Sequence, residues 1–290
     1  MSSLMFDGSP VAAEAIPDTD PDRPYAGLCL HTVTTKPWDI EVAVERYAAA
    51  GLGGITIWRD AVEGRDPGHI RTRIRDAGLK IVSLCRGGFF ASREASERAA
   101  ALEDNREVID LAAQLGAPLV VLVCGADPRQ SLFDSRTQIG DALSELAPYA
   151  AERGVRLGIE PLHPMYADTR SAVNTVRDAR LLAEQVGETN VGVVVDVYHV
   201  WWDPDLQTEL TALGNERLFG YHICDWRVPT EHMLTDRGIM GEGCIPISTI
   251  SEWVRATGFQ GFDEVEIFST RLWSQDQDTV LKRIMEAWNG

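Results

Sequence analysis

The stretch Val191-Gly192-Val193-Val194-Val195-Asp196-Val197-Tyr198-His199 decides the fold. A continuous run of β-branched residues is typical of a parallel strand covered on both faces, whereas a half-exposed strand alternates apolar with polar residues. Asp196 therefore lies where a buried strand ends. Because parallel α/β folds bind ligands at the carboxyl ends of their strands, Asp196 is a candidate site residue, and a helix cap is the alternative.

Similar apolar runs alternate with segments of helical period from Tyr25 to the C-terminus. The predicted strands are Ala26–His31, Gly54–Trp58, Lys80–Cys85, Leu119–Cys124, Val155–Glu160, Gly192–Asp196, Leu218–His222 and Glu264–Ile267. The predicted helices begin near Trp38, Pro67, Ser96, Asp134, Thr169, Asp203, Pro246 and Gln275. This series of strand-then-helix units predicts an α/β fold, the (β/α)8 TIM barrel. A doubly wound open sheet is the alternative, but no GxGxxG motif follows the first strand.

The domain organisation predicted from composition is a single barrel over residues 25–290, preceded by an irregular arm over residues 1–24 that is acidic and rich in proline. The chain of 290 residues is 44% hydrophobic and 24% charged, which is ordinary for a globular domain. A barrel of this kind commonly fills about 250 residues.

The charge excludes several classes of partner. With 44 acidic against 27 basic residues, the net charge of −17 repels nucleic acid and anionic membranes. No apolar run approaches the roughly 18 residues that a membrane span needs. The five cysteines show no zinc-site spacing, and the N-terminus lacks a secretory pattern, so a cytoplasmic location is expected.

Four potential metal ligands stand at the ends of the last four predicted strands: Glu160, Asp196, His222 and Glu266. Each alone is more simply a cap or a surface charge. Neighbouring strands are about 4.8 Å apart, and barrel curvature directs inward-pointing residues to a shared point. Three carboxylates and an imidazole without a thiolate suit Mn²⁺, Mg²⁺ or Co²⁺, so jointly they predict a site for one divalent cation.

Strand parity predicts what lies beneath these ligands, because residues two apart share a face. The residues two positions earlier are small and uncharged in three strands, namely Gly158, Val194 and Gly220. The fourth is Glu264, which we expect to be buried against a basic partner or displaced by a bulge.

Further candidates for substrate binding lie at or shortly after predicted strand ends in the same mouth of the barrel: His31, Trp58, Arg86 and His163. An aromatic ring there stacks on the apolar face of a sugar, although a Trp at a strand end more often belongs to the core. The pair Trp201-Trp202 is expected to cover the pocket or to form a subunit contact, which makes a homo-oligomer reasonable.

Four motifs carry a resemblance to a known superfamily: Gly158-Ile159-Glu160-Pro161-Leu162-His163-Pro164, Val195-Asp196-Val197-Tyr198-His199, Gly220-Tyr221-His222-Ile223-Cys224-Asp225 and Val265-Glu266-Ile267-Phe268-Ser269. From Tyr25 onward the chain resembles xylose-isomerase-like TIM-barrel proteins. It is similar to the sugar phosphate isomerase/epimerase group, which includes ketose 3-epimerases, hydroxypyruvate isomerases and inosose dehydratases.

The resemblance implies one metal ion, with Mn²⁺ favoured, held by the four ligands named above. It also implies that Glu160 and Glu266 act as acid and base. His199 resembles a substrate-contacting histidine, and Arg227 a basic residue that follows the metal histidine, with slightly different spacing. The structural alternatives are a hydrogen-bonded residue at a helix start for His199 and an ordinary loop charge for Arg227.

The resulting hypothesis is a divalent-metal-dependent isomerase or epimerase that acts on a small carbohydrate through an enediolate. A lyase or dehydratase shares every ligand and remains the main alternative, because only the fate of the enolate differs. An apurinic-site endonuclease is disfavoured by the net charge, and a non-catalytic barrel by the intact glutamates. No phosphate-binding loop supports a phosphorylated substrate.

Overall fold

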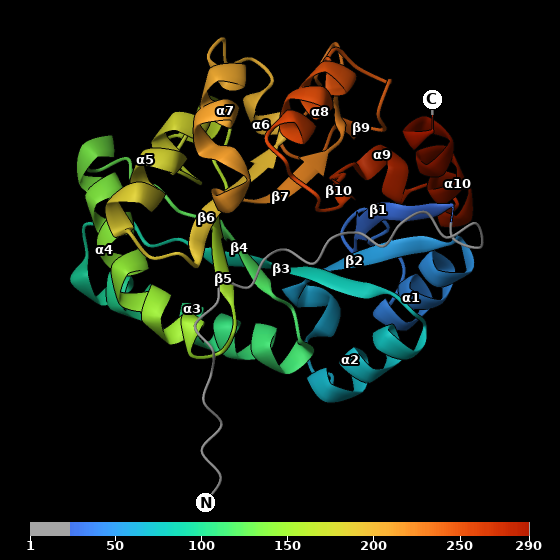
Figure 1. Ribbon diagram of the computed structural model, residues 1–290, viewed down its shortest axis with the longest axis horizontal. Helices are drawn as coiled ribbons and strands as arrows, with labels where there is room; N and C mark the ends of the chain where they lie inside the picture. The colour runs from blue at the N-terminus through green and yellow to red at the C-terminus, as the bar shows by residue number, and fades with distance from the viewer. Residues whose placement is uncertain (1–23, 290) are drawn as a thin grey trace, which may run out of the picture.

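A closed barrel of parallel strands forms the centre of the molecule (Figure 1). The computed structural model describes residues 24–289, so the predicted N-terminal arm lies almost wholly outside the described residues. Within this range the strands follow the order β1-β10-β7-β6-β5-β4-β3-β2 around the barrel. Their bounds are Tyr25–His31 (β1), Leu52–Trp58 (β2), Lys80–Gly88 (β3), Leu119–Val123 (β4), Arg156–Ile159 (β5), Val191–Asp196 (β6), Leu218–Ile223 (β7) and Asp263–Val265 (β10).

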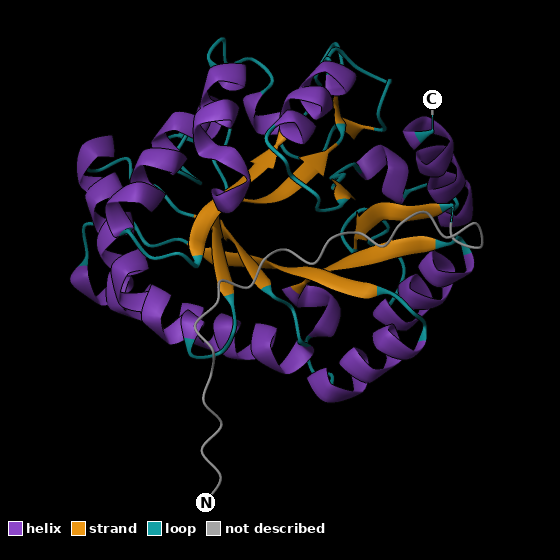
Figure 2. Cartoon of the chain, in the orientation of Figure 1, coloured by secondary structure: helices purple, strands orange, loops and turns teal. Residues whose placement is uncertain are grey.

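Helices surround the barrel on the outside (Figure 2). The longer ones are Ile40–Ala49 (α1), Pro67–Asp76 (α2), Ala95–Leu115 (α3), Leu132–Ala151 (α4), Val176–Val186 (α5), Leu206–Arg217 (α7), Ile247–Ala256 (α8) and Gln277–Trp288 (α10). Short helices are Val197–Val200 (α6) and Thr270–Trp273 (α9), with 3-10 turns at Arg59–Val62 and Pro164–Tyr166. Among the described helices, none is both long and apolar enough to cross a bilayer.

The TIM-barrel prediction is confirmed, and each predicted strand is present with shifted ends. The helix predicted near Thr169 is the largest error, because α5 begins only at Val176. Its start is fixed by the side chain of Thr175, which accepts a hydrogen bond from the backbone of Asp178. The predicted end of the last strand was also wrong: β10 stops at Val265, so Glu266 follows the strand instead of lying within it.

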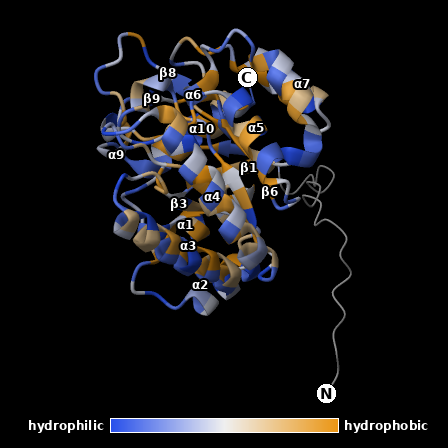
Figure 3. Cartoon of the chain, turned by 90° about the vertical axis from the view of Figure 1, so that its left-hand side faces the viewer, coloured by the Kyte–Doolittle hydropathy of each residue, from blue (hydrophilic) through white to orange (hydrophobic). Residues whose placement is uncertain are grey.

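The barrel interior is packed, as the uninterrupted valine run implies. All of β6 is buried, with Val193, Val194 and Val195 fully inaccessible to solvent. Inside the barrel Val194 joins an apolar cluster with Cys85, Leu119, Val121 and Phe219. Figure 3 shows hydrophobic colour concentrated on the strands and on the helix faces that cover them. A side chain at Gly158 would meet Val194 at 2.6 Å, so this layer accepts only a small residue there.

A long connection between β7 and α8 carries two short antiparallel strands, Asp225–Trp226 (β8) and Arg237–Gly238 (β9). The carboxylate of Asp225 organises it by accepting hydrogen bonds from the backbone of Gly241, Gly243 and Ile245 at 2.8–3.0 Å. Backbone bonding of Arg237 to Phe268 then ties the connection to the segment after β10.

Candidate metal and substrate site

The structure brings the four predicted ligands together. One donor atom from each of Glu160, Asp196, His222 and Glu266 lies within 4.8 Å of the others, and all four side chains are buried. Asp196 and His222 are paired across β6 and β7, which sets them side by side. Glu160 and Glu266 come directly after β5 and β10, the flanking strands.

The donor atoms themselves fit a divalent cation. His222 Nδ1 and Glu160 Oε1 lie 3.1 Å apart, but both are buried without a hydrogen-bond partner. Buried polar atoms without a partner are costly, and a shared cation is one way to satisfy several of them at once. The set of three carboxylates and one imidazole suits a hard or borderline metal ion. These residues would therefore hold such an ion through oxygen and nitrogen.

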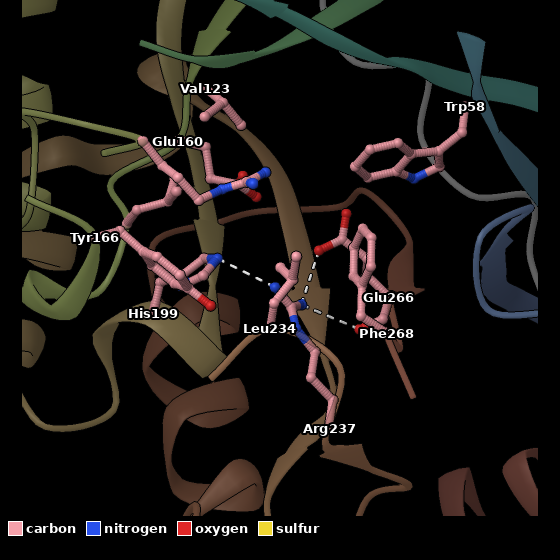
Figure 4. A pocket seen from close by; sticks show the side chains of 11 residues that line it. Trp58, Val123, Glu160, Tyr166, His199, Leu234, Arg237, Glu266 and Phe268 are labelled. Atoms are coloured by element: carbon pink, nitrogen blue, oxygen red, sulfur yellow. Dashed lines mark hydrogen bonds and ion pairs between the residues drawn. The ribbon is translucent and has the colours of Figure 1, made fainter. Parts of the chain in front are cut away.

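Arg237, which the sequence reasoning missed, lies among the ligands. Its Nη1 donates to Asp196 Oδ2 and to Glu266 Oε2, each at 2.8 Å, and its Nη2 lies 3.2 Å from His199 Nε2. Figure 4 shows Arg237 between His199 and Glu266. No local pattern identifies Arg237, because β9 reaches the site only through the long connection.

The electrostatics of the site follow from burial and from Arg237. Burial raises the pKa of Asp196 to about 7, although the nearby guanidinium acts in the opposite direction. Burial also opposes the charged form of Glu266, but Arg237 and His31 outweigh it and hold the pKa of that carboxyl well below its ordinary value. The pKa of His199 is lowered well below its usual range by burial and then by Arg237. His199 is therefore a neutral imidazole that accepts a hydrogen bond from Arg237 through Nε2.

A layer of polar side chains supports the ligands from below, where Glu264 is buried. Its Oε2 accepts a hydrogen bond from Thr56 at 2.7 Å and lies 3.4 Å from His31 Nε2. Burial lowers the pKa of His31, but hydrogen bonds and charge from Glu264 and Glu266 prevail and raise it to about 9. Of the two outcomes expected for Glu264, the structure shows burial against a basic partner, and that partner is His31.

The other predicted substrate residues divide into two groups. His31 Nδ1 lies 3.1 Å from Glu266 Oε1, and the indole nitrogen of Trp58 lies 3.3 Å from the same His31 atom, so both adjoin the ligands. His163 instead packs against Trp226, with ring centroids 5.0 Å apart. Arg227 forms an ion pair with Asp236.

Arg86, the remaining predicted residue, has its guanidinium 4.3 Å from the ring centre of Phe89. The tryptophan pair packs within the same end of the barrel: Trp201 lies against Trp226 and Trp202 against His163, with centroids 5.7 Å apart in both cases.

A cavity opens above the ligands to solvent, and the space between its atoms is about 300 Å³ when open solvent is included. Figure 4 shows Glu160 and Glu266 on opposite sides of it, with Trp58 above Glu266. The lining residues are Trp58, Val123, Glu160, Leu162, Tyr166, Arg170, His199, Leu234, Arg237, Glu266 and Phe268. The arrangement thus presents two carboxylates, a neutral imidazole and an aromatic ring to a small molecule.

Comparison with curated proteins finds enzymes that act on carbohydrate-like compounds. The chain is 28% identical over 232 residues to the 3-dehydroshikimate dehydratase of Pseudomonas aeruginosa, covering 78% of this chain and 36% of that protein. It thus spans about a third of that dehydratase. An inosose isomerase of Bacillus velezensis is 25% identical, with 72% and 74% covered. The 3-dehydro-D-guloside 4-epimerase of Escherichia coli is 24% identical, with 67% and 74% covered.

Solved structures share the fold. Protein SMc04130 of Sinorhizobium meliloti 1021 is 41% identical, with a TM-score of 0.87 and 91% and 97% of the two chains covered. The IOLI protein, whose structure holds a zinc atom, is 20% identical with a TM-score of 0.81 over 90% and 96% of the chains. The profile of the family described as "Xylose isomerase-like TIM barrel" matches residues 44–288. The chain therefore belongs to the xylose isomerase-like TIM barrel family.

Proposed function

We propose that this protein is a divalent-metal-dependent isomerase or epimerase of a small keto-sugar or keto-cyclitol. The observation that carries the proposal is the placement of Glu160 and Glu266 on opposite sides of one cavity, within a cluster of four ligands. Mn²⁺ is the ion we favour for this donor set. The relatives named isomerases and epimerases support a reaction of this class.

The proposed reaction moves a proton at carbon. One glutamate removes the proton from the carbon next to a carbonyl, and the electron pair of the C–H bond forms an enediolate. The other glutamate then delivers a proton to the opposite face of that carbon, or to the neighbouring carbon. A divalent cation held by the four ligands supplies the positive charge that polarises the carbonyl. His199, a neutral imidazole that lines the cavity, orients a substrate hydroxyl.

Elimination is the second candidate, and the match to a dehydratase favours it specifically. Proton removal is the same, but the electron pair of the enolate then expels a β-hydroxyl group, which takes a proton from the other glutamate and leaves as water. The two outcomes are separated by following Mn²⁺-loaded protein in D₂O with ketoses, inososes and 3-keto-glycosides. Deuterium incorporation at carbon without loss of water indicates isomerisation or epimerisation, and formation of an enone indicates elimination.

Glutamate variants test the assignment of acid and base. Glu160→Gln and Glu266→Gln are each expected to lower the rate of C–H exchange by about 100-fold or more, because the proton acceptor is lost. The exposed Glu252 offers a matched control, so Glu252→Gln should exchange at the wild-type rate. Exchange in both site variants at the wild-type rate would overturn the proposal.

A further inference from the structure

We propose that Arg170 and Arg86 form a recognition site for a carboxylate group on the substrate. This inference rests on the proposed function and narrows its substrate class to keto-sugar acids or keto-cyclitol acids. Its core is Arg170, an arginine without a counter-ion in a cavity whose other walls carry the reacting glutamates, with Arg86 held nearby through the backbone of Phe89 and Gly125.

Arg170 reaches the cavity directly. It lines the same space as Glu160 and His199, and its guanidinium lies 5.9 Å from the ring centre of Tyr166. Within residues 24–289 Arg170 forms no ion pair, and its side chain makes no hydrogen bond. Arg237, the other arginine of the cavity, instead contacts two carboxylates. Arg170 is thus the cavity cation whose donors are available to a ligand.

Arg86 is held next to this position by the backbone. Arg170 accepts a backbone hydrogen bond from Gly125 at 2.8 Å, and Gly125 packs so closely on Phe89 that a Cβ there would be 2.7 Å from Phe89 Cα. Arg86 in turn lies over the Phe89 ring. Phe89 has a φ of 58°, a rare conformation for a residue with a side chain, and backbone bonds to β4 hold it there.

The positive charge of Arg170 also acts on Arg86. Burial lowers the pKa of Arg86, and the positive charges of Arg170 and then Arg59 lower it further. Arg59 is already neutralised by a bidentate pair with Asp104 at 2.8 and 3.0 Å. Arg86 and Arg170 have no such pair, so their mutual repulsion is relieved when an anion binds.

The chemistry favours a carboxylate over a phosphate. A guanidinium presents parallel donors that match the two oxygens of a carboxylate. A phosphoryl group adds a third oxygen, which is usually met by backbone N–H groups of a glycine-rich loop at a helix start, and the sequence contains no such motif after the last strands. In a protein of net charge −17, two unpaired arginines also supply the local positive potential that an acidic substrate requires.

Binding of matched sugars to the Mn²⁺-loaded full chain tests the inference. Isothermal titration is run with D-fructuronate and D-fructose, and with D-tagaturonate and D-tagatose, which differ only in a terminal carboxylate. At least one acid should bind about tenfold more tightly than its neutral partner. Equal affinity within both pairs, including the absence of binding by all four sugars, would overturn the inference. D-fructose 6-phosphate binding more tightly than D-fructuronate would also overturn it, in favour of a phosphate.

Variants of Arg170 and Arg86 test whether these residues cause the preference for the acid over the neutral sugar. Arg170→Met and Arg86→Met should each weaken binding of the acid by about tenfold and that of its neutral partner less than about threefold. Arg59→Met, which alters an arginine already paired with Asp104, should leave both affinities unchanged. Equal weakening of acid and neutral sugar in the site variants would contradict carboxylate recognition. Because binding is measured at equilibrium, the preference can hold where C–H exchange fails, and exchange restricted to neutral sugars would leave the proposed function standing without the carboxylate site.

Discussion

At the scale of single residues, Arg237 sets the charge balance of the site. Nη1 of Arg237 forms ion pairs with both Asp196 and Glu266, and all three side chains are buried. A buried ion pair that loses one partner leaves an uncompensated charge, which is far more costly than loss of an exposed pair. Arg237 therefore orients the two carboxylates and also favours their charged forms in the barrel.

Replacement of Arg237 tests this role. Arg237→Met is expected to lower the free energy of unfolding by about 3–5 kcal/mol, measured by urea denaturation of the metal-free protein. Arg255, which pairs with Asp263 at the surface, is the control, and Arg255→Met should cost at most about 1 kcal/mol. If Arg237→Met lowers the free energy of unfolding no more than the control does, the buried carboxylates do not need Arg237 for stability.

The raised pKa of Asp196 predicts a pH-dependent affinity for metal. A carboxyl group must lose its proton to bind a cation, and the pKa of Asp196 is about 7 in the metal-free protein. Protons therefore compete with the metal below pH 7, and the affinity for Mn²⁺ should fall by at least about tenfold for each pH unit lost there, because His222, whose pKa is also raised, must lose a proton too. Above pH 7 this contribution disappears. Titration calorimetry between about pH 5.5 and 8 measures the effect, and a constant affinity over that range would contradict it.

At the scale of structural elements, the connection after β7 delivers Arg237 to the site. Its shape depends on one acid, because Asp225 accepts three backbone hydrogen bonds from residues 241–245. A side chain at Gly243 would meet Trp226 O at 2.1 Å, so the connection is also tightly packed there. The aromatic stack of Trp226 on Tyr198, with centroids 4.7 Å apart, fixes it against α6.

Loss of the Asp225 carboxylate should therefore impair the site from a distance. Asp225→Ala leaves several backbone donors without an acceptor, at about 1–3 kcal/mol for each buried group. We expect cleavage by trypsin at Arg227 to accelerate and C–H exchange to fall by about tenfold or more as Arg237 loses its position. Asp225→Asn keeps one oxygen acceptor and should be less affected. Wild-type exchange in Asp225→Ala would show that the connection places Arg237 without this acid.

The sequence predicts those parts of the fold and of the site that depend on local patterns, and it misses those that depend on contacts between distant segments. Periodicity predicts the barrel because a strand such as β6 is buried on both faces, and it predicts the ligands because each lies within one residue of a strand end. Arg237 and Arg170 escaped prediction because both lie on connections whose paths are set by contacts with distant segments, such as Phe268 and Gly125. Arg227 had the expected type and approximate spacing, but the structure pairs it with Asp236.

At the scale of the whole molecule, bound metal should contribute to stability. A ligand that binds only the folded state stabilises it by about 2.7 kcal/mol at a concentration 100 times its Kd. For a chain of this size we expect Mn²⁺ to raise Tm by roughly 4–5 °C relative to chelator-treated protein, as measured by scanning calorimetry. Asp196→Asn, which weakens one ligand, should show a much smaller increase. A Tm unaffected by Mn²⁺ in the wild-type chain would contradict a site assembled by folding.

The order of strands around the barrel has one more consequence. The proposed metal ligands lie on or directly after β5, β6, β7 and β10, which form one continuous arc, whereas Trp58 and Arg86 lie on β2 and β3 in the other arc. The proposed ligands thereby lie in one half of the closed sheet and two predicted substrate residues in the other, although Arg170, in the connection after β5, belongs to the ligand half. An engineer could exchange the rim segments after β2 and β3 to seek a new substrate while the arc that binds the cation stays intact, and natural divergence has the same freedom.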